Sequence, residues 1–184
     1  IFNGNNYSDD WVAEAKRRGL SNLRTTVDAL PAFVSDKSIR LFTAHRVFSE
    51  AEVRSRYEIL LEGYCKTLHI EALTMVYMVK KDIMPACLAY QEELAALLCQ
   101  KQSCGVFDTT LEETLLGKIS GLCGRLLKKL DALEEAILGV RQGGEAEALA
   151  GFYRDRGFAA MNELRLVADE LETLVAHKHW PKPT

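Results

Sequence analysis

Apolar side chains recur at steps of three, four and seven residues between about residues 49 and 100, the pattern of one long amphipathic helix. Ser49-Glu50-Ala51-Glu52 opens this stretch as a capping box, in which a hydroxyl and a carboxylate each accept a hydrogen bond from an unpaired backbone N–H. Pro85 lies inside the helix and has no N–H, so we expect a kink near residues 82–84. The apolar stripe consists of Val53, Tyr57, Leu60, Tyr64, Leu68, Met75, Val79, Ile83, Tyr90, Leu94 and Leu97.

Two further long helices are predicted after residue 109. Thr110-Leu111-Glu112-Glu113 is a second capping box, and we expect the helix that it opens to end at Gly143-Gly144. A third long helix is predicted from Leu149 to Leu174. Short links between long helices make antiparallel neighbours, so the pattern predicts an all-α, up-down-up bundle. The stripe of the second helix consists of Leu111, Leu115, Ile119, Leu122, Leu126, Leu130, Leu133, Ile137 and Val140.

Gly117, Gly121 and Gly124 lie inside the second long helix. A glycine in a helix costs about 1 kcal/mol relative to alanine, and we expect these three to compensate by allowing a neighbouring helix to approach closely. Arg125 and Lys128-Lys129 form a short basic patch, which is more typical of a solvated face than of a phosphate site.

Residues 1–48 show only short helical patterns. Ser8 can cap a helix that ends at Gly19, and Ser35 can cap a second short helix. We therefore expect an N-terminal arm of short helices over residues 1–48, followed by a long-helix bundle over residues 49–184.

The composition fits an ordinary globular domain. The chain has 184 residues, 48% hydrophobic and 27% charged, with a net charge of −3, which argues against a nucleic-acid-binding domain. No apolar stretch is long enough to span a membrane. Five cysteines without a CxxC pair suggest reduced thiols in a cytoplasmic protein. The chain opens on Ile1 without a signal peptide, so we expect a piece of a longer protein.

The sequence contains no recognisable catalytic, cofactor or metal motif. It has no Glu-x-x-His pair for a di-iron bundle, no Gly-x-Ser-x-Gly nucleophile motif and no phosphate-binding loop. His177-Lys178-His179 is interpreted as the positive C-terminal end of a helix rather than as a metal site. These observations favour an interaction or structural role over catalysis by this chain.

An ordered set of short segments runs through both ends of the chain. Its members are Phe2-Asn3-Gly4-Asn5-Asn6-Tyr7-Ser8, Trp11, Arg18-Gly19-Leu20, Leu23-Arg24-Thr25-Thr26, Asp28-Ala29-Leu30-Pro31, Ser55-Arg56-Tyr57-Glu58, Ile70-Glu71-Ala72, Thr74-Met75, Pro85-Ala86, Tyr90-Gln91, Asp169-Glu170-Leu171-Glu172, Leu174-Val175, Trp180-Pro181 and Pro183-Thr184. Together they resemble the region beyond the catalytic barrel in type III glutamine synthetases. The resemblance covers roughly residues 1–100 and 160–184, and Lys182 stands where an aromatic residue is expected.

The resemblance implies a parent ligase that makes glutamine from glutamate, ammonia and ATP through an acyl-phosphate intermediate. That family uses divalent metals, Mg or Mn, and assembles into rings. Its metal-binding carboxylates and phosphate-contacting arginines lie in the barrel, so the resemblance places no catalytic, cofactor-binding or metal-binding residue on this chain.

Our leading hypothesis is therefore the C-terminal helical domain of a type III glutamine synthetase, which buttresses the catalytic core or joins subunits of a ring-shaped homo-oligomer. Trp11, Arg56, Tyr57, Glu71 and Trp180 are the residues that we expect to hold these contacts. The first alternative is a stand-alone adaptor that binds a protein partner through an apolar patch on the predicted 111–141 helix. The second alternative is a cofactor-binding bundle enzyme, which the missing ligand spacing disfavours.

Overall fold

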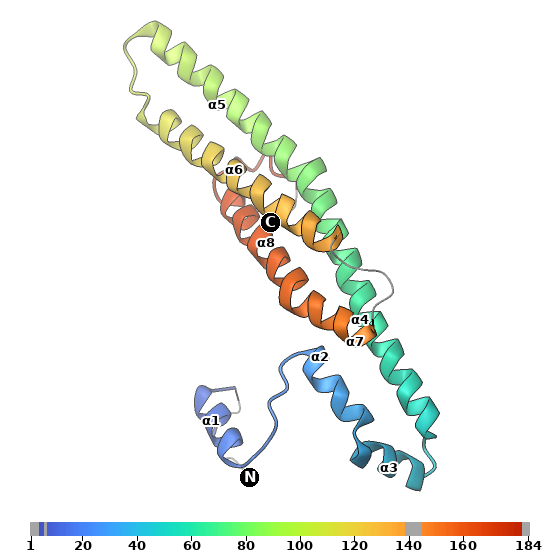
Figure 1. Cartoon of the computed structure of the whole chain (residues 1–184). Helices are drawn as coiled ribbons and strands as arrows, with labels where there is room; N and C mark the ends of the chain where they lie inside the picture. The colour runs from blue at the N-terminus through green and yellow to red at the C-terminus, as the bar shows by residue number, and fades with distance from the viewer. Residues whose placement is uncertain (1–3, 6, 139–144, 182–184) are drawn as a thin grey trace. The chain divides into compact units, whose positions relative to one another are not determined.

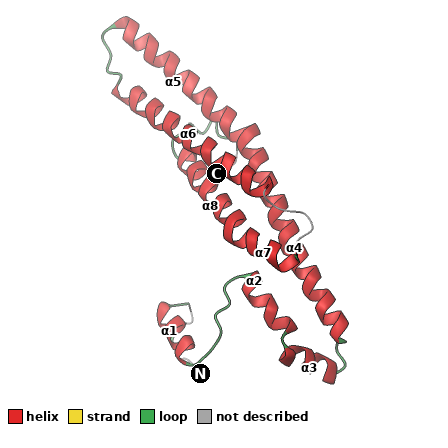
Figure 2. Cartoon of the chain, viewed as in Figure 1, coloured by secondary structure: helices red, strands yellow, loops and turns green. Residues whose placement is uncertain are grey.

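The computed structural model describes residues 4–5, 7–138 and 145–181. Every regular element within these ranges is a helix, and they contain no strand (Figure 2). The predicted all-α class is confirmed. The chain divides into two compact units, Ile1–Tyr64 and Cys65–Thr184, and each is described by itself.

The first unit is built from short helices and the beginning of a long one. Ser35 caps α3 as predicted, because its Oγ accepts a hydrogen bond of 3.3 Å from the backbone N–H of Ser38. Ser8 stands at the N-cap of α1, but its hydroxyl donates to the carbonyl of Asn5 instead of capping the helix. The elements are α1 (Asp9–Arg17), α2 (Thr26–Ala29), the 3₁₀ helix η1 (Leu30–Val34), α3 (Asp36–Ala44) and the first part of α4 (Glu50–Met78).

The capping box that opens α4 forms as predicted. The backbone N–H of Glu52 donates to Ser49 Oγ at 3.3 Å, and the backbone N–H of Ser49 donates to Glu52 Oε2 at 2.7 Å. These reciprocal bonds satisfy two donors that the first helical turn leaves unpaired. The start of α4 is therefore determined by residues that are neighbours in the sequence.

The second unit is the predicted up-down-up bundle. The chain rises through α4 and α5, returns along α6, and reverses again through α7 and α8, with α6 packed against both α5 and α8 (Figure 1). The predicted end of the second helix at Gly143-Gly144 lies outside the described residues. The elements after α4 are the π-helical segment η2 (Val79–Ile83), α5 (Met84–Cys104), α6 (Thr110–Leu138), α7 (Ala146–Phe152), the π-helical segment η3 (Tyr153–Gly157) and α8 (Phe158–Glu172).

The irregularity expected at Pro85 takes the form of a π-helical turn. The segment Val79–Ile83 directly precedes α5, and Pro85 occupies the first turn of that helix. A proline cannot donate a hydrogen bond and crowds the carbonyl four residues before it. The wider π turn relieves this crowding without ending the helix.

The core of the second unit is centred on one face of α6. Its residues Ile119, Leu122, Leu126, Leu130 and Leu133 are all buried. They pack in one cluster with apolar side chains of the other long helices. Those partners are Ala72, Val79, Ile83, Cys87, Leu94, Met161, Leu164, Val167, Leu171 and Val175.

Three members of the predicted stripes are exposed, which corrects the prediction. Leu60, Leu97 and Leu111 are 49%, 40% and 66% exposed, whereas Leu61 and Glu112 are buried. At 60–61 and at 111–112, the second residue of the pair is buried in place of the predicted first one. Leu61 and Glu112 each lie seven positions before a buried residue, Leu68 and Ile119, so the heptad spacing favours them over their neighbours.

The glycines of α6 do not mark a close helix contact. A Cβ atom added to Gly117, Gly121 or Gly124 would meet nothing within 4 Å. The expectation of close approach is therefore wrong. Gly117 and Gly121 instead line an open groove between α6 and α8, together with Glu170 and Thr173 of the opposite side.

We predict that Leu126→Ala lowers the free energy of unfolding by about 2–5 kcal/mol, because Leu126 is fully buried and its removal leaves a cavity. The measurement is urea unfolding followed by circular dichroism. Leu127→Ala is the matched control, since the neighbouring Leu127 is 46% exposed and should cost less than about 1 kcal/mol. Equal losses in the two variants would contradict the described core.

Candidate functional site

The segment after α8 binds back onto the bundle. We call residues 173–181 the C-terminal strap. Lys178 Nζ donates to Glu93 Oε1 of α5 at 2.7 Å, and His179 Nε2 lies 2.8 Å from Glu93 Oε2. The pKa of Glu93 is lowered, first by the hydrogen bond from Lys178 and then by that from His179. Because α8 ends at Glu172, the interpretation of residues 177–179 as a helix end is wrong.

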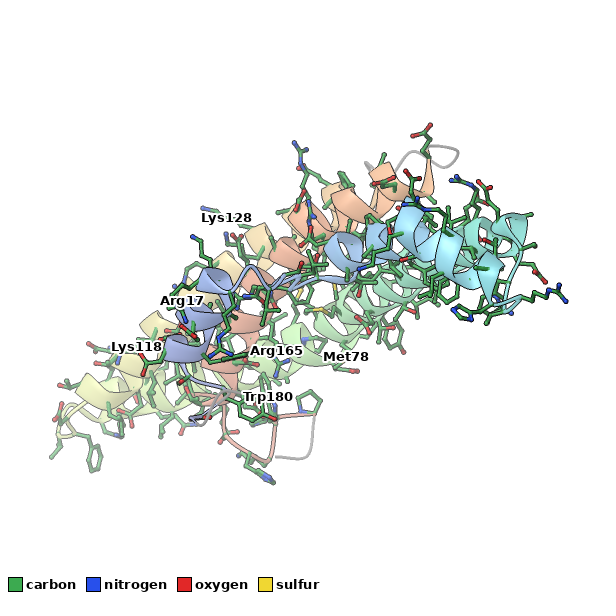
Figure 3. All side chains as sticks on the ribbon, turned by 90° about the horizontal axis from the view of Figure 1, so that it is seen from below. Arg17, Met78, Lys118, Lys128, Arg165 and Trp180 are labelled. Carbon is green, nitrogen blue, oxygen red and sulfur yellow. The ribbon has the colours of Figure 1, made fainter. Side chains whose placement is uncertain are left out.

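Trp180 of the strap packs against the core cluster and lines a pocket of about 310 Å³. Met78 and Val79 line it from the end of α4 and from η2, and Leu164 lines it from α8. Arg165, which forms an ion pair with Asp169, stands at its polar edge. Figure 3 labels Met78, Arg165 and Trp180 among these side chains. The strap is thus attached by the buried Val175, by Trp180 and by one cluster of charges.

A buried tyrosine joins the second π-helical segment to α4. Tyr153 is 4% exposed, and its hydroxyl lies 2.9 Å from His69 Nδ1. Burial raises the pKa of Tyr153, so the phenol stays protonated and can donate to the imidazole. Gly157 fits beneath this ring, because a Cβ atom there would lie 3.0 Å from Tyr153 Cδ1. Sequence reasoning missed this contact, whose partners are 84 positions apart.

The turn between α5 and α6 is held by a largely buried ion pair. Lys101 Nζ lies 2.5 Å from Oε1 of Glu112, which is 5% exposed. The Lys101 hydrogen bond is the main cause that lowers the pKa of Glu112. Among the described residues, Glu112 Oε2 has no hydrogen-bond partner. Glu112 lies seven positions before the buried Ile119, a spacing that could have indicated its burial.

The predicted capping box at Thr110 does not form. The backbone N–H of Thr110 donates to Asp108 Oδ1 at 2.9 Å, so an aspartate takes the capping role. Glu113 Oε1 accepts from the hydroxyl of Thr109 rather than from a backbone N–H. α6 begins at Thr110, one residue before the start that the predicted box implies, and its capping groups differ from the predicted ones.

One face of α4 in the second unit is exposed and apolar. Ile70, Leu73 and Tyr77 are spaced by three and four residues, and they are 63%, 48% and 62% exposed. Ile70 also lines a groove of about 400 Å³, together with Phe158 of α8. We call Ile70, Leu73, Tyr77 and Phe158 the outer face. Apolar side chains clustered in this way are typical of a surface that contacts another protein.

The five residues predicted to hold contacts belong to both units, and each is described within its own unit. Trp11 lies on α1 and is partly buried, and Tyr57 is partly buried on α4. Arg56 is exposed and stacks over the ring of Phe48, 4.4 Å from its centroid. Glu71 is exposed and lines the same groove as Ile70.

Within these five, Trp180 has the strongest structural anchor, because it contacts the core cluster and lines the strap pocket. Arg56 and Glu71 do not need buried partners, since both are exposed.

The described part of the chain holds no group of three or more His, Cys, Asp or Glu side chains that could bind a metal ion. We assign no step of a reaction to these residues. None of its helices combines the length and the apolar character needed to cross a lipid bilayer.

We predict that Glu112→Gln destabilises the chain at pH 7 and that the loss shrinks in acid. The folded-state pKa of Glu112 is lowered from 4.5, so its stabilising effect is complete above that value and disappears as pH falls through the folded pKa. Urea unfolding at a series of pH values measures this. Lys101→Met should also lose less stability in acid than at pH 7, because it leaves a buried carboxylate unpaired and protonation removes that charge. A loss of stability that stays the same across the pH series in either variant would contradict the pairing.

We predict that Trp180→Ala releases the C-terminal strap and costs about 2 kcal/mol, less than a fully buried tryptophan because Trp180 is partly exposed. In a Trp11→Phe background, Trp180 is the only tryptophan, so its fluorescence reports its environment. In the Trp11→Phe chain, which keeps Trp180, the emission should shift to the red at a lower denaturant concentration than the one at which the circular dichroism changes, because the strap opens before the helices unfold. Leu166→Ala, 70% exposed on α8, is the control and should change neither signal.

The family model and the relatives that match this chain are all glutamine synthetases. The model of the glutamine synthetase C-terminal domain family matches residues 1–102. The chain is 42% identical over 185 residues to a glutamine synthetase of Butyrivibrio fibrisolvens and 34% identical over 188 residues to a type-3 glutamine synthetase of Dictyostelium discoideum. Each match covers 100% of this chain but 26% of the relative, so the chain spans about a quarter of their length. The chain belongs to the glutamine synthetase C-terminal domain family.

Proposed function

We propose that this chain is the C-terminal helical part of a type III glutamine synthetase, an ATP-dependent glutamate–ammonia ligase of the cytoplasm. The observation that carries this proposal is the match of the whole chain to about a quarter of the length of its relatives, including a type-3 glutamine synthetase. ATP and the divalent metals would be bound by the rest of the ligase, outside these residues.

The role of the chain in that enzyme is structural. The exposed outer face supports a contact with the catalytic part or with a neighbouring subunit of a ring-shaped homo-oligomer. Ile70, Leu73 and Tyr77 present apolar surface on a helix that is rigidly packed on its other side by the core cluster. A preformed rigid face loses little entropy when it binds, which suits a permanent contact.

The proposal is tested in the complete ligase that contains this chain. Leu73→Asp combined with Tyr77→Asp places charges in the proposed contact, and burying an unpaired charge should weaken assembly by roughly a hundredfold or more. Sedimentation measures assembly, and glutamine formation measures activity. Leu166→Asp on α8, equally apolar and 70% exposed, is the matched control and should leave the assembly intact.

Separate results would contradict separate parts of the proposal. Unchanged assembly in the double variant would remove the outer face as the contact. Glutamine formation by residues 1–184 alone would contradict the structural role. A stand-alone chain that captures a different protein through Leu111, Leu127 and Leu138 of α6, all exposed, would support the adaptor alternative instead.

A further inference from the structure

Two cysteines face each other across the contact between α5 and α6. Cys87 of α5 is fully buried and belongs to the core cluster. Cys123 of α6 is partly exposed and packs against the same cluster. The two helices are antiparallel neighbours that pack against each other (Figure 1).

A single side chain connects the two positions. Gln91 Nε2 donates to the sulfur of Cys123 at 3.5 Å and to the backbone carbonyl of Cys87 at 3.3 Å. Gln91 lies one helical turn after Cys87, so the amide reaches both groups without strain. A donor directed at the Cys123 sulfur stabilises its thiolate form, which is the reactive form of cysteine.

We propose that Cys87 and Cys123 form a reversible disulfide between α5 and α6, with Cys123 as the thiolate that reacts with hydrogen peroxide and Cys87 as the resolving thiol. Partial exposure gives the oxidant access to Cys123 alone, while burial keeps Cys87 from reacting first.

The proposed chemistry has two steps. The Cys123 thiolate attacks one peroxide oxygen, the O–O bond breaks, and the leaving hydroxide takes a proton to become water, so that Cys123 becomes a sulfenic acid. The sulfur of Cys87 then attacks the sulfur of Cys123, the S–O bond breaks, and the released hydroxide takes the Cys87 proton as a second water. The thiols lose two electrons, and the peroxide gains them. A dithiol reductant reverses the bond by exchange.

The electrostatics agree with this assignment of roles. The Cys87 thiol donates toward Cys123, which lowers the pKa of Cys123, and Gln91 adds to this effect. The same interaction, together with burial, raises the pKa of Cys87. The partly exposed cysteine is therefore the better nucleophile, and the buried one retains its proton until the second step.

The test uses the full chain, purified in reduced form and treated with hydrogen peroxide. Remaining thiols are alkylated, and peptides are analysed by mass spectrometry without reduction. The expected product is a Cys87–Cys123 linked peptide pair that lacks two hydrogen atoms and separates after dithiothreitol. Cys99 and Cys104, both exposed, are internal controls for oxidation that does not depend on the fold.

Cys87→Ser should abolish the linked pair and leave Cys123 as a sulfenic acid that dimedone traps. Cys87→Ala serves the same purpose if the serine variant does not fold, as judged by circular dichroism. Cys99→Ser is the matched control and should leave the linked pair unchanged.

Three results would overturn the inference. The first is the absence of the linked pair under conditions that oxidise Cys99. The second is a linked pair that forms equally in the chain unfolded by guanidinium, since the fold would then not direct it. The third is a Cys87→Ser variant that folds but gives no dimedone adduct on Cys123.

Discussion

The buried face of α6 holds the second unit together, because α6 packs against both α5 and α8. Side chains such as Leu126 and Leu133 are fully buried between them, so neither outer helix can keep its position if this face is lost. Exposed ion pairs between α6 and α8, such as Arg125 with Glu170 and Lys129 with Glu163, add little stability.

Function in this chain is expected to lie on surfaces rather than in a pocket. In the strap Trp180 packs against the core cluster, whereas Tyr77 of the outer face is exposed. A domain that supports a larger enzyme needs a rigid interior and specific contact residues, and it needs no reactive centre of its own. The membership of the glutamine synthetase C-terminal domain family fits such a division of labour.

Features of the structure that depend on neighbouring residues could be predicted from the sequence. Features that depend on residues far apart in the chain could not. The Ser49 capping box and the irregularity at Pro85 follow from local chemistry, and both were predicted. The burial of Glu112 depends on Lys101, which approaches only after the chain has turned. The segment η3 could not be predicted, because Tyr153 is held there by His69 from another helix. The contact of Glu93 with Lys178 and His179 of the strap could not be predicted for the same reason, because its partners are far apart in the sequence.

The two π-helical segments, Val79–Ile83 and Tyr153–Gly157, have a consequence for how related chains should be compared. Each one accommodates roughly one residue beyond an α-helical turn, so the heptad register of the sequence shifts by one position across it while the packed face continues. A heptad count carried across either segment would therefore assign core positions to the surface. When relatives differ in length by a single residue within these long helices, the gap belongs in these segments, where an α turn and a π turn can replace each other without moving the packed faces on either side.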